Sequence, residues 1–427
     1  MKLLEYFAGF ACALALSHTA AAQVLFTIPS PAEALGNVRD LDGDGRRELV
    51  LGAPSLSLLE IRTGANGALL SSTTAGLAPS ARFASSIDVL GDLDLDGFDE
   101  LVVGAPNDGI VGSVRVVSSR TGAVLRNFSA LGQSSTACPL HPKLYGFAVK
   151  AIGDLTGDGF SEVAIGAPGW DNANCADFGL VEIVDVRPAT PVFVNTLKGR
   201  GLSTNGPFSC ASIHDVQFGY SLASVGDLNQ DGILEIVVGA PGANEAIGFD
   251  GVSCLATFTP VVTSRLRVAG GQSLGVSISG IGDIDGDGTS DVVTGVPNLS
   301  LMAANLATTY RFSGKSVGNY AGGFPPPLGL IGFGAALGRQ LGWSMARIRD
   351  MNGDGISDFL AGAGSPCNTI PGAHYILSGA NGGILQFVTH PTSPTYGQAV
   401  CPTGNAGPNN RPTFMVADPS SGTVTVR

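Results

Sequence analysis

The chain has little charge and, above all, little positive charge. Only 14% of its 427 residues are charged, and 23 Lys and Arg stand against 35 Asp and Glu, which gives a formal net charge of −12. An average soluble protein has about 25% charged residues. Because so few basic residues cannot neutralise a phosphate backbone, the composition excludes a nucleic-acid-binding protein. The excess of negative charge needs an explanation.

Long apolar runs and helical periodicity are also missing. Beyond the N-terminal segment, the apolar stretch Leu328–Gly338 falls short of the ~18 residues that a membrane span needs. No stretch has a convincing helical period. Gly is abundant, with 61 residues, roughly twice the usual share, but without the three-residue period of collagen. The hydrophobic fraction of 44% suffices for a sizeable core, which argues against wholesale disorder.

The N-terminus has the pattern of a secretory signal peptide. Lys2 precedes the apolar stretch Phe7–Leu16, and the small residues Ala20–Ala22 follow as a cleavage site. We expect residues 1–22 to be the signal peptide and residues 23–427 to be the mature protein. The mature protein would then be secreted, displayed at the cell surface or held in a periplasm.

One unit recurs along the chain. In the segment Gly226–Pro241 an acidic loop is followed by the apolar run Ile236–Val238 and then by Gly-Ala-Pro. Five related loops start at Asp40, Asp92, Asp154, Asp283 and Asp350. Nine residues before the loop stands an aromatic residue or Leu, in five copies: Phe83, Tyr145, Phe218, Leu274 and Leu341. The first copy has Pro31-Ala32 at this place and is degenerate there.

A seventh copy lies at the C-terminus. Tyr396-Gly397 fills the aromatic-Gly position, Asn405 the first loop position and Phe414–Pro419 the strand and the Pro, but the loop has no carboxylate. Repeats of this length indicate a stack or ring of similar units and not two or three independent domains.

The strands within each unit are short. Apolar, β-branched runs are bounded by Gly and Pro, and a second alternating run such as Ser113–Val117 follows each Gly-Ala-Pro. Four short strands in each of seven units predict an all-β protein, a seven-bladed β-propeller with a degenerate seventh blade. We expect Val24–Phe26 to add a strand to the last blade and close the ring, because an open ring leaves sheet edges exposed.

The acidic loops have the chemistry of calcium sites. They read Asp-x-Asp-x-Asp-Gly with an acid at position nine, and Ca²⁺ takes six to eight hard oxygen ligands. An EF-hand would need an acid at position twelve and flanking helices, so that reading fails. A solvated acidic turn would explain one such loop, but not six in register.

We therefore predict about six structural Ca²⁺ ions. The expected ligands, with position seven giving its carbonyl oxygen, are Asp40, Asp42, Asp44, Arg46, Glu48; Asp92, Asp94, Asp96, Phe98, Glu100; Asp154, Thr156, Asp158, Phe160, Glu162; Asp227, Asn229, Asp231, Ile233, Glu235; Asp283, Asp285, Asp287, Thr289, Asp291; Asp350, Asn352, Asp354, Ile356 and Asp358. Thr156, Asn229 and Asn352 replace an acid, so their sites should bind more weakly.

The aromatic-Gly and Gly-Ala-Pro elements, with the acidic loops between them, resemble the FG-GAP repeats of the β-propeller found in integrin α-subunits and in many secreted bacterial proteins. The resemblance covers nearly all of residues 23–427. It implies seven blades, Ca²⁺ held in hairpin loops on one face, and protein or glycan ligands bound by loops on the opposite face. The chain departs from the pattern in its first and seventh copies and at Gly364, which stands where a Pro is expected.

Six cysteines remain after removal of residues 1–22. In an exported chain an even number indicates disulfides. Matching positions in neighbouring repeats suggest the pairs Cys138–Cys175 and Cys210–Cys254, which leaves Cys367–Cys401. This is one of 15 possible connectivities.

Catalytic patterns are weak. Ser221 and Ser344 lie in Gly-x-Ser-x-Ala segments that resemble a nucleophile elbow, but both occupy one fixed repeat position. The histidines His141, His214, His374 and His390 stand at non-equivalent positions. A carboxylate pair for glycoside cleavage stays open among the acids outside the loops.

Ligand contacts are expected in two insertions. They are Trp170 and Asp171 in one, and Phe208 and His214 in the other, since exposed aromatic residues beside polar groups suit glycan or protein contact. The alternative is that Trp170 packs beneath its own loop.

The favoured function is a non-enzymatic, calcium-stabilised propeller for adhesion or ligand binding outside the cell. A secreted hydrolase or polysaccharide lyase, or a scaffold without a small ligand, are the alternatives. The charge imbalance also finds its explanation, because three loops carry four carboxylates and three carry three, 21 of the 35 in all. Six Ca²⁺ ions would neutralise the net charge.

Overall fold

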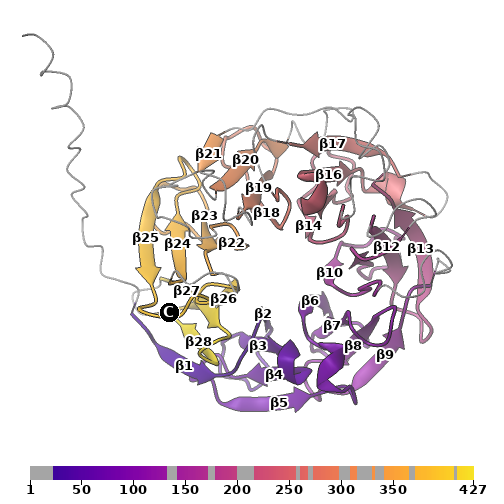
Figure 1. The fold of residues 1–427 in the computed structure, drawn as a ribbon, viewed down its shortest axis with the longest axis horizontal. Helices are drawn as coiled ribbons and strands as arrows, with labels where there is room; N and C mark the ends of the chain where they lie inside the picture. The colour runs from indigo at the N-terminus through magenta and orange to yellow at the C-terminus, as the bar shows by residue number, and fades with distance from the viewer. Residues whose placement is uncertain are drawn as a thin grey trace, which may run out of the picture.

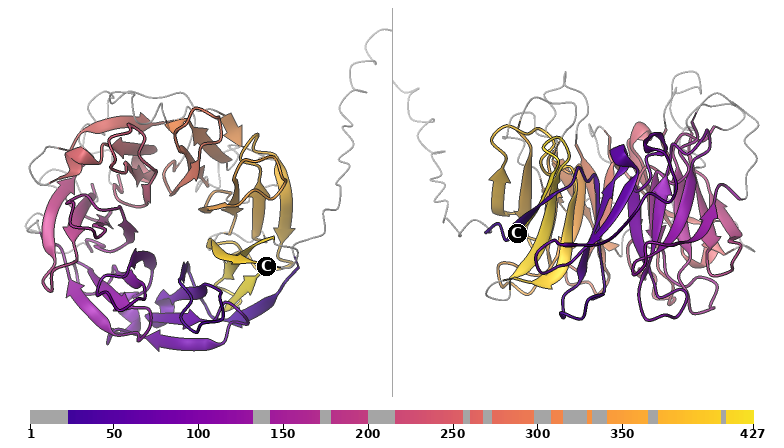
Figure 2. Two further views of the ribbon diagram at one scale, coloured as in Figure 1. Left: turned by 180° about the vertical axis from the view of Figure 1, so that it is seen from behind. Right: turned by 90° about the horizontal axis from the view of Figure 1, so that it is seen from below.

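Seven blades are arranged round a central axis in the computed structural model of the protein (Figure 1). The structure describes residues 23–131, 142–171, 178–199, 216–255, 260–267, 273–297, 308–314, 329–331, 341–364, 371–407 and 411–427. Each blade is a four-stranded antiparallel sheet, so the predicted seven-bladed propeller is confirmed. The side view in Figure 2 shows the strands running between the two faces of the ring.

The blades are numbered in chain order, and each is given with its strands from the innermost to the outermost. Blade 1 consists of β2 (Ala34–Val38), β3 (Glu48–Ala53), β4 (Leu58–Arg62) and β5 (Leu69–Thr73); blade 2 of β6 (Ser86–Gly91), β7 (Glu100–Ala105), β8 (Ser113–Ser118) and β9 (Val124–Phe128); blade 3 of β10 (Ala148–Ala151), β11 (Val163–Ala167), β12 (Leu180–Asp185) and β13 (Val192–Leu197); blade 4 of β14 (Leu222–Ser224), β15 (Ile236–Ala240), β16 (Glu245–Phe249) and β17 (Val262–Leu266).

The remaining blades follow the same order. Blade 5 consists of β18 (Ser277–Gly282), β19 (Asp291–Val296), β20 (Thr308–Phe312) and β21 (Gly329–Ile331); blade 6 of β22 (Ser344–Ile348), β23 (Asp358–Gly362), β24 (Ala373–Leu377) and β25 (Ile384–Thr389); blade 7 of β26 (Val400–Ala406), β27 (Pro412–Asp418), β28 (Thr423–Val426) and β1 (Phe26–Pro29). Short 3-10 helices are η1 (Pro54–Leu56), η2 (Pro79–Ala81), η3 (Pro241–Ala243) and η4 (Val252–Cys254).

The ring is closed by the two ends of the described chain. Strand β1 pairs with β28 in antiparallel register, with Phe26 opposite Val426. The N–H of Leu25 also donates to the carbonyl oxygen of Val426 (2.9 Å). The predicted closure is therefore confirmed, with the strand beginning two residues later than expected. It covers the outer edge of β28 and gives blade 7 its fourth strand.

The core lies between neighbouring blades. The second strand of each blade is the most apolar, and all residues of β3, β7, β15 and β19 are buried. One cluster joins Val50 and Leu59 of blade 1 to Leu101 and Val103 of blade 2, and similar clusters follow round the ring. In outer strands such as β5 and β9, most residues are exposed or half-buried. A propeller blade thus has no core of its own and depends on its neighbours.

The Gly of Gly-Ala-Pro is required by this close packing. A Cβ atom on Gly239 would overlap the carbonyl oxygen of Gly275, in the aromatic-Gly element of the next blade. The same overlap would occur at Gly104, Gly166, Gly295 and Gly362. Gly is therefore needed at this position of the repeat because two neighbouring blades approach each other too closely for a Cβ atom.

No helix in the described part of the chain is long and apolar enough to cross a membrane. The expected signal peptide, residues 1–22, lies outside the described residues.

Candidate functional site

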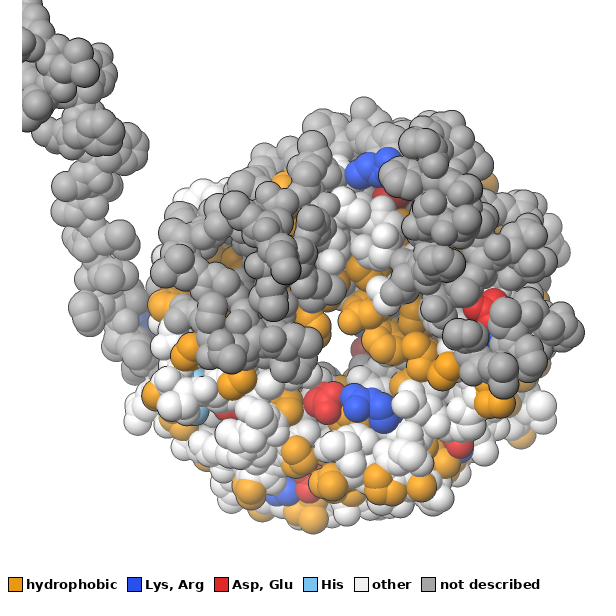
Figure 3. Space-filling view, viewed as in Figure 1, with side chains coloured by type: hydrophobic (Ala, Val, Ile, Leu, Met, Phe, Trp, Pro, Cys, Tyr) orange, Lys and Arg blue, Asp and Glu red, His pale blue; other side chains and the backbone are white. Residues whose placement is uncertain are grey.

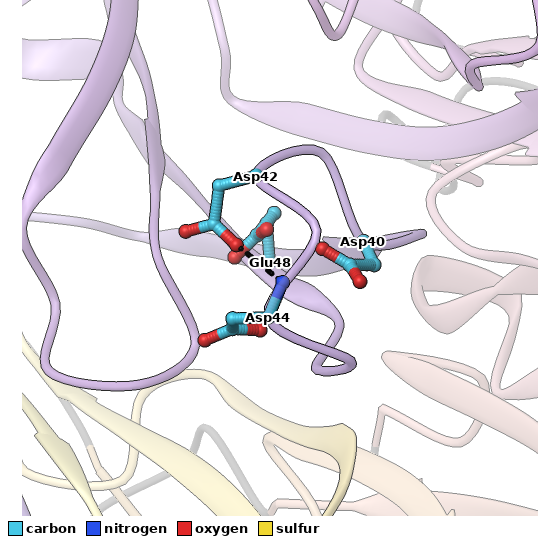
Figure 4. Close-up of side chains that lie close together, drawn as sticks. All are labelled: Asp40, Asp42, Asp44 and Glu48. Atoms are coloured by element: carbon cyan, nitrogen blue, oxygen red, sulfur yellow. Dashed lines mark hydrogen bonds between the residues drawn. The ribbon is translucent and has the colours of Figure 1, made fainter.

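The acidic loops join the first strand of a blade to the second. In loop 1, between β2 and β3, carboxylate oxygens of Asp40, Asp42, Asp44 and Glu48 lie within 4.8 Å of one another. Figure 4 shows these four side chains close together. Gly-Ala-Pro lies at the other end of the same second strand. The face drawn in Figure 3 shows few acidic side chains among its coloured residues.

The loops hold their shape through hydrogen bonds to their own carboxylates. The backbone N–H at position six donates to the Asp at position one in each of the six: Gly45 to Asp40 (2.7 Å), Gly97 to Asp92 (2.9 Å), Gly159 to Asp154 (2.7 Å), Gly232 to Asp227 (2.8 Å), Gly288 to Asp283 (2.9 Å) and Gly355 to Asp350 (2.7 Å). These glycines have φ between 82° and 93°, which residues with a Cβ avoid. Hydrogen bonds from Gly45 and Gly355 lower the pKa of Asp40 and of Asp350.

The acid at position nine is buried and begins the second strand. The exposed fraction is 0% for Glu48, Glu100 and Glu162 and 1% for Glu235. Each accepts the backbone N–H of position two, for example Leu93 to Glu100 (2.6 Å). Desolvation raises the pKa of Glu100 and of Glu235 to about 7, and that of Asp291 to about 6. A buried acid surrounded by other carboxylates is costly unless a cation compensates for the charge.

Some carboxylate oxygens have no partner at all. Oε1 of Glu100, Oε1 of Glu235 and Oδ1 of Asp92 are buried and receive no hydrogen bond. Buried polar atoms normally have a hydrogen-bond partner, so these oxygens need a partner from outside the polypeptide. Hard oxygens on a tight loop are the donor set that Ca²⁺ takes, and the residues present fit that ion.

The six loops are not equivalent. Groups of at least three carboxylates within 4.8 Å occur in loops 1 to 5 among the described residues. Loop 6 is not among them, and there the Asn352 amide donates to Asp354 (2.9 Å). In loop 3, the Thr156 hydroxyl donates to Oε1 of Glu162 (2.8 Å) and occupies an oxygen that is free in loop 2.

Sequence reasoning missed acids on the third strand. Asp250 follows β16 and accepts a hydrogen bond from the Asn229 amide in loop 4 (2.8 Å). Its charge contributes to the raised pKa of Glu235, and Asp185 acts in the same way on Glu162. Each lies one residue beyond the register pair that follows the position-nine acid, Val163 with Val184 and Ile236 with Phe249. An acid at the end of the third strand was therefore the available signal.

Loop 7 replaces these carboxylates by neutral groups. Thr413 stands where the other loops have the buried acid, and its hydroxyl pairs with that of Thr403. The side chain of Asn405 reaches blade 1, where its Oδ1 accepts the N–H of Arg47 (2.7 Å) and its Nδ2 donates to the Arg47 carbonyl (2.8 Å). The seventh loop is therefore tied to the first by hydrogen bonds.

The candidate serines and two of the candidate histidines lie among the described residues. The hydroxyl of Ser221 donates to the carbonyl of Gly275 (2.7 Å), and Ser344 to that of Gly397 (3.3 Å), each in the next blade. His374 is fully buried, and burial lowers its pKa to about 3. His390 accepts the N–H of Ser393 at Nδ1 (2.8 Å). His141 and His214 lie outside the described residues.

Trp170 and Asp171 lie in the interior. Their exposed fractions are 7% and 6%, Trp170 belongs to the core between blades 2 and 3, and Asp171 forms an ion pair with buried Lys143. This placement corrects the expectation of exposed ligand contacts at Trp170 and Asp171, because both side chains are buried against the blades. Phe208 and His214 lie outside the described residues.

The predicted disulfides stay predictions. Cys254 and Cys401 carry free thiols in the structure, and burial raises the pKa of each to about 12. Cys138, Cys175, Cys210 and Cys367 lie outside the described residues.

Comparison with known proteins agrees with the repeats. A family model described as FG-GAP repeat matches residues 83–124, 151–181 and 218–252. Integrin alpha-4 of Xenopus laevis is 25% identical over 287 residues, which is 65% of this chain and 24% of that protein. Integrin alpha-7 of Mus musculus is 31% identical over 153 residues, 35% of this chain and 12% of that protein. The chain thus spans a quarter or less of the length of these relatives.

A solved structure shows the fold alone. A chain in the crystal structure of BBS1N in complex with ARL6DN, soaked with mercury, superposes with a TM-score of 0.56 at 12% sequence identity. The match covers 95% of this chain and 96% of that chain.

Proposed function

We propose that this chain, whose FG-GAP repeats form a ring of seven blades, is an exported ligand-binding or adhesion module with structural calcium. Its similarity to integrin α-subunits supports a binding role over catalysis. The proposal includes removal of residues 1–22, which N-terminal sequencing of the exported protein would test. Recovery of Met1 at the N-terminus of that protein would contradict it.

The buried acid at position nine is the observation that carries the calcium role. It is held at the start of the second strand in six blades, and in two of them one of its oxygens has no partner. A divalent cation at each loop would compensate the carboxylates and bind the loop to the second strand. Binding to the folded form alone stabilises that form by mass action.

Metal analysis of the purified protein tests the calcium proposal. After dialysis against calcium and removal of free ion, we expect about six Ca²⁺ per chain. Loops 3, 4 and 6, with three carboxylates each, should release their ions first during stepwise chelation. A metal-free protein with an unchanged melting curve would overturn the structural role of calcium.

A binding screen tests the module. The calcium-loaded protein is applied to arrays of extracellular proteins and glycans, with the chelated protein as control. A ligand retained only by the loaded form supports the proposal. Turnover of polysaccharides or phosphoesters without a retained ligand would favour the hydrolase or lyase alternative instead.

A further inference from the structure

At some seams between blades, on the side of the acidic loops, the residue before a loop lies against position eight of the loop in the next blade. A Cβ on Gly153 would contact Leu234 (3.2 Å), and a Cβ on Gly226 would contact Ser290 (3.0 Å). The small residue before the loop makes room for the larger one across the seam. Gly91 and Gly282 are different, since a Cβ on Gly91 would meet nothing within 4 Å and a Cβ on Gly282 would meet the Arg347 guanidinium.

Blade 1 has Arg39 in place of this Gly, and blade 2 has an acid, Asp99, at position eight of its loop. The Asp99 carboxylate accepts the Arg39 backbone N–H (2.8 Å) and its Nε (2.7 Å), and it forms an ion pair with the guanidinium. Asp99 is almost fully buried, so a carboxylate fills this seam and meets both donor groups of one arginine.

Blade 6 also has Arg in this position, but blade 7 offers no acid. Arg349 is exposed and faces Pro412, the residue at position eight, which has no carboxylate. The structure gives Arg349 no hydrogen bond or ion pair among the described residues, for its backbone N–H or for its guanidinium.

An open pocket occupies this seam. Its volume is about 230 Å³, and its lining includes both exposed arginines of β22 and the segment after it, Arg347 and Arg349, together with Ser357, Asn405 and Pro412. Arg347 donates to the Ser357 hydroxyl (2.8 Å), and its guanidinium lies beside Gly282 of blade 5. None of the described residues that line the pocket is acidic.

We infer that this pocket is a carboxylate-binding site in which an external carboxylate takes the place that Asp99 fills between blades 1 and 2. The acceptor oxygens would receive the N–H and guanidinium of Arg349, with Arg347 adding a second positive charge. A volume of this size suits the side chain of an Asp or Glu, or a small free carboxylate.

This inference deepens the proposed function and rests on it, because it gives the chemistry of one ligand group. It also places a contact on the side of the acidic loops, whereas the resemblance implied ligands on the opposite face. The two sources of the carboxylate, an acidic side chain of a partner and a free small acid, share the same recognition chemistry and are separated by the test.

Titration of the calcium-loaded protein with three probes tests the site. The probes are the capped peptide Gly-Gly-Asp-Gly-Gly, its Asn counterpart and acetate, each followed by NMR of the arginine Nε–H signals. We expect the Asp peptide and acetate to shift the Arg349 signal and the Asn peptide to leave it unchanged. Stronger binding of the peptide points to a partner side chain, and equal binding to a free acid. No shift with either acid overturns the inference.

Substitutions test the carboxylate site independently of the NMR titration. Arg349→Gln should weaken binding of the Asp peptide about tenfold, while Arg126→Gln, which removes a charge on an outer strand, should not change it. Pro412→Asp should abolish binding with Arg349 intact, since an internal carboxylate fills the seam. Asp99→Ala should open a second site, which keeps the inference testable if the Pro412 variant does not fold. Equal affinities in all variants would overturn it.

The outcomes also separate the site from the proposed function. If a ligand from the arrays binds the Arg349→Gln variant as well as the wild type, and the Asp peptide does not bind, the carboxylate site is refuted and the binding module is still supported. If the Asp peptide binds specifically but the arrays retain no ligand, the site is supported and the result counts against the module.

Discussion

Loop 1 and loop 7 lie beside each other at the seam that closes the ring, and they hold their strands by different chemistry. Loop 1 gathers four carboxylates within 4.8 Å, an arrangement that suits a cation. Loop 7 has Thr413 at the position of the buried acid and uses the Asn405 side chain to bind the Arg47 backbone. Under the proposed calcium role, six blades would depend on an ion from solution, while the closing blade would depend only on the polypeptide.

The same contrast holds at the other end of the blades. Gly239 and its counterparts pack against the aromatic-Gly carbonyl of the next blade. In blade 7 this position is Ala417, and the next blade, blade 1, has Pro31-Ala32 at the aromatic-Gly position. The two departures occur at one seam, because the blade that lacks the Gly meets the blade that lacks the aromatic-Gly element.

Chelation should have the largest effect. Removal of calcium by EDTA leaves the clustered carboxylates of six loops uncompensated, so the melting temperature should fall strongly. Each ion at one hundred times its dissociation constant contributes about 2.7 kcal/mol. Calorimetry with and without EDTA measures the change. Hydrogen exchange should show loops 1 to 6 losing protection more than loop 7, and equal loss in all seven would contradict the comparison.

Gly239→Ala should be the most harmful single substitution of this set. Its Cβ would overlap the Gly275 carbonyl, and overpacking of this kind costs about 3 kcal/mol. The matched control is Ala417→Gly in blade 7, for which we expect about 1 kcal/mol or less. Denaturant unfolding measures both. Similar losses would show that the seams of blades 4 and 7 are equally tight.

The metal-free protein should be more stable at pH 5 than at pH 8. Desolvation raises the pKa of Glu100 and Glu235 from 4.5 to about 7, and that of Asp291 from 3.8 to about 6. An acid whose folded pKa exceeds the unfolded value stabilises the fold at low pH and loses that contribution as pH rises through the folded value. Melting curves in EDTA between pH 5 and 8 measure the trend. With calcium the trend should reverse, because the ion requires ionised carboxylates.

Glu100→Gln should act in opposite directions with and without calcium. In the loaded protein it removes one ligand charge, so one ion is lost and the melting temperature falls. In EDTA at pH 8 it removes a buried acid that is costly to ionise, so the melting temperature rises. Thr413→Val, at the same position of blade 7, should show no dependence on calcium. A fall of equal size in both buffers for Glu100→Gln would show that the acid is only a packing residue.

Asn405→Ala should have the smallest effect. It removes two hydrogen bonds to the Arg47 backbone, worth about 1 to 2 kcal/mol. The loss should be the same with and without calcium, which distinguishes loop 7 from the others. A loss that appears only with calcium would place an ion near this seam.

Much of the fold could be predicted because the same sequence pattern occurs seven times along the chain. The aromatic-Gly and Gly-Ala-Pro elements mark the two partners of each seam, and the acidic loops mark the turn between the first two strands. Closure by an N-terminal strand could also be predicted, although β1 begins at Phe26 and not at Val24. Trp170 was harder to place, since an insertion rich in polar residues does not reveal whether its aromatic side chain packs inward.

Contacts between strands and between blades were out of reach of the sequence. Asp250 follows the third strand of blade 4, 21 residues after Asn229, and the two meet only because the strands of that blade lie side by side. The pairing of Arg39 with Asp99 spans 60 residues, and the absence of such a partner for Arg349 has no local sign. Such contacts depend on which residue the neighbouring blade presents at one point in space.

The number of blades, the loops that gather carboxylates and the loop that does not could be predicted from sequence alone, because these are properties of a repeated local pattern. The folded structure was needed to show that Asn405 ties loop 7 to blade 1, that the position-nine acids are buried, with one unpartnered oxygen in Glu100 and in Glu235, and that a pocket with two arginines opens between blades 6 and 7. Those features arise where two blades meet, and the distance and burial at a seam are set by the closed ring.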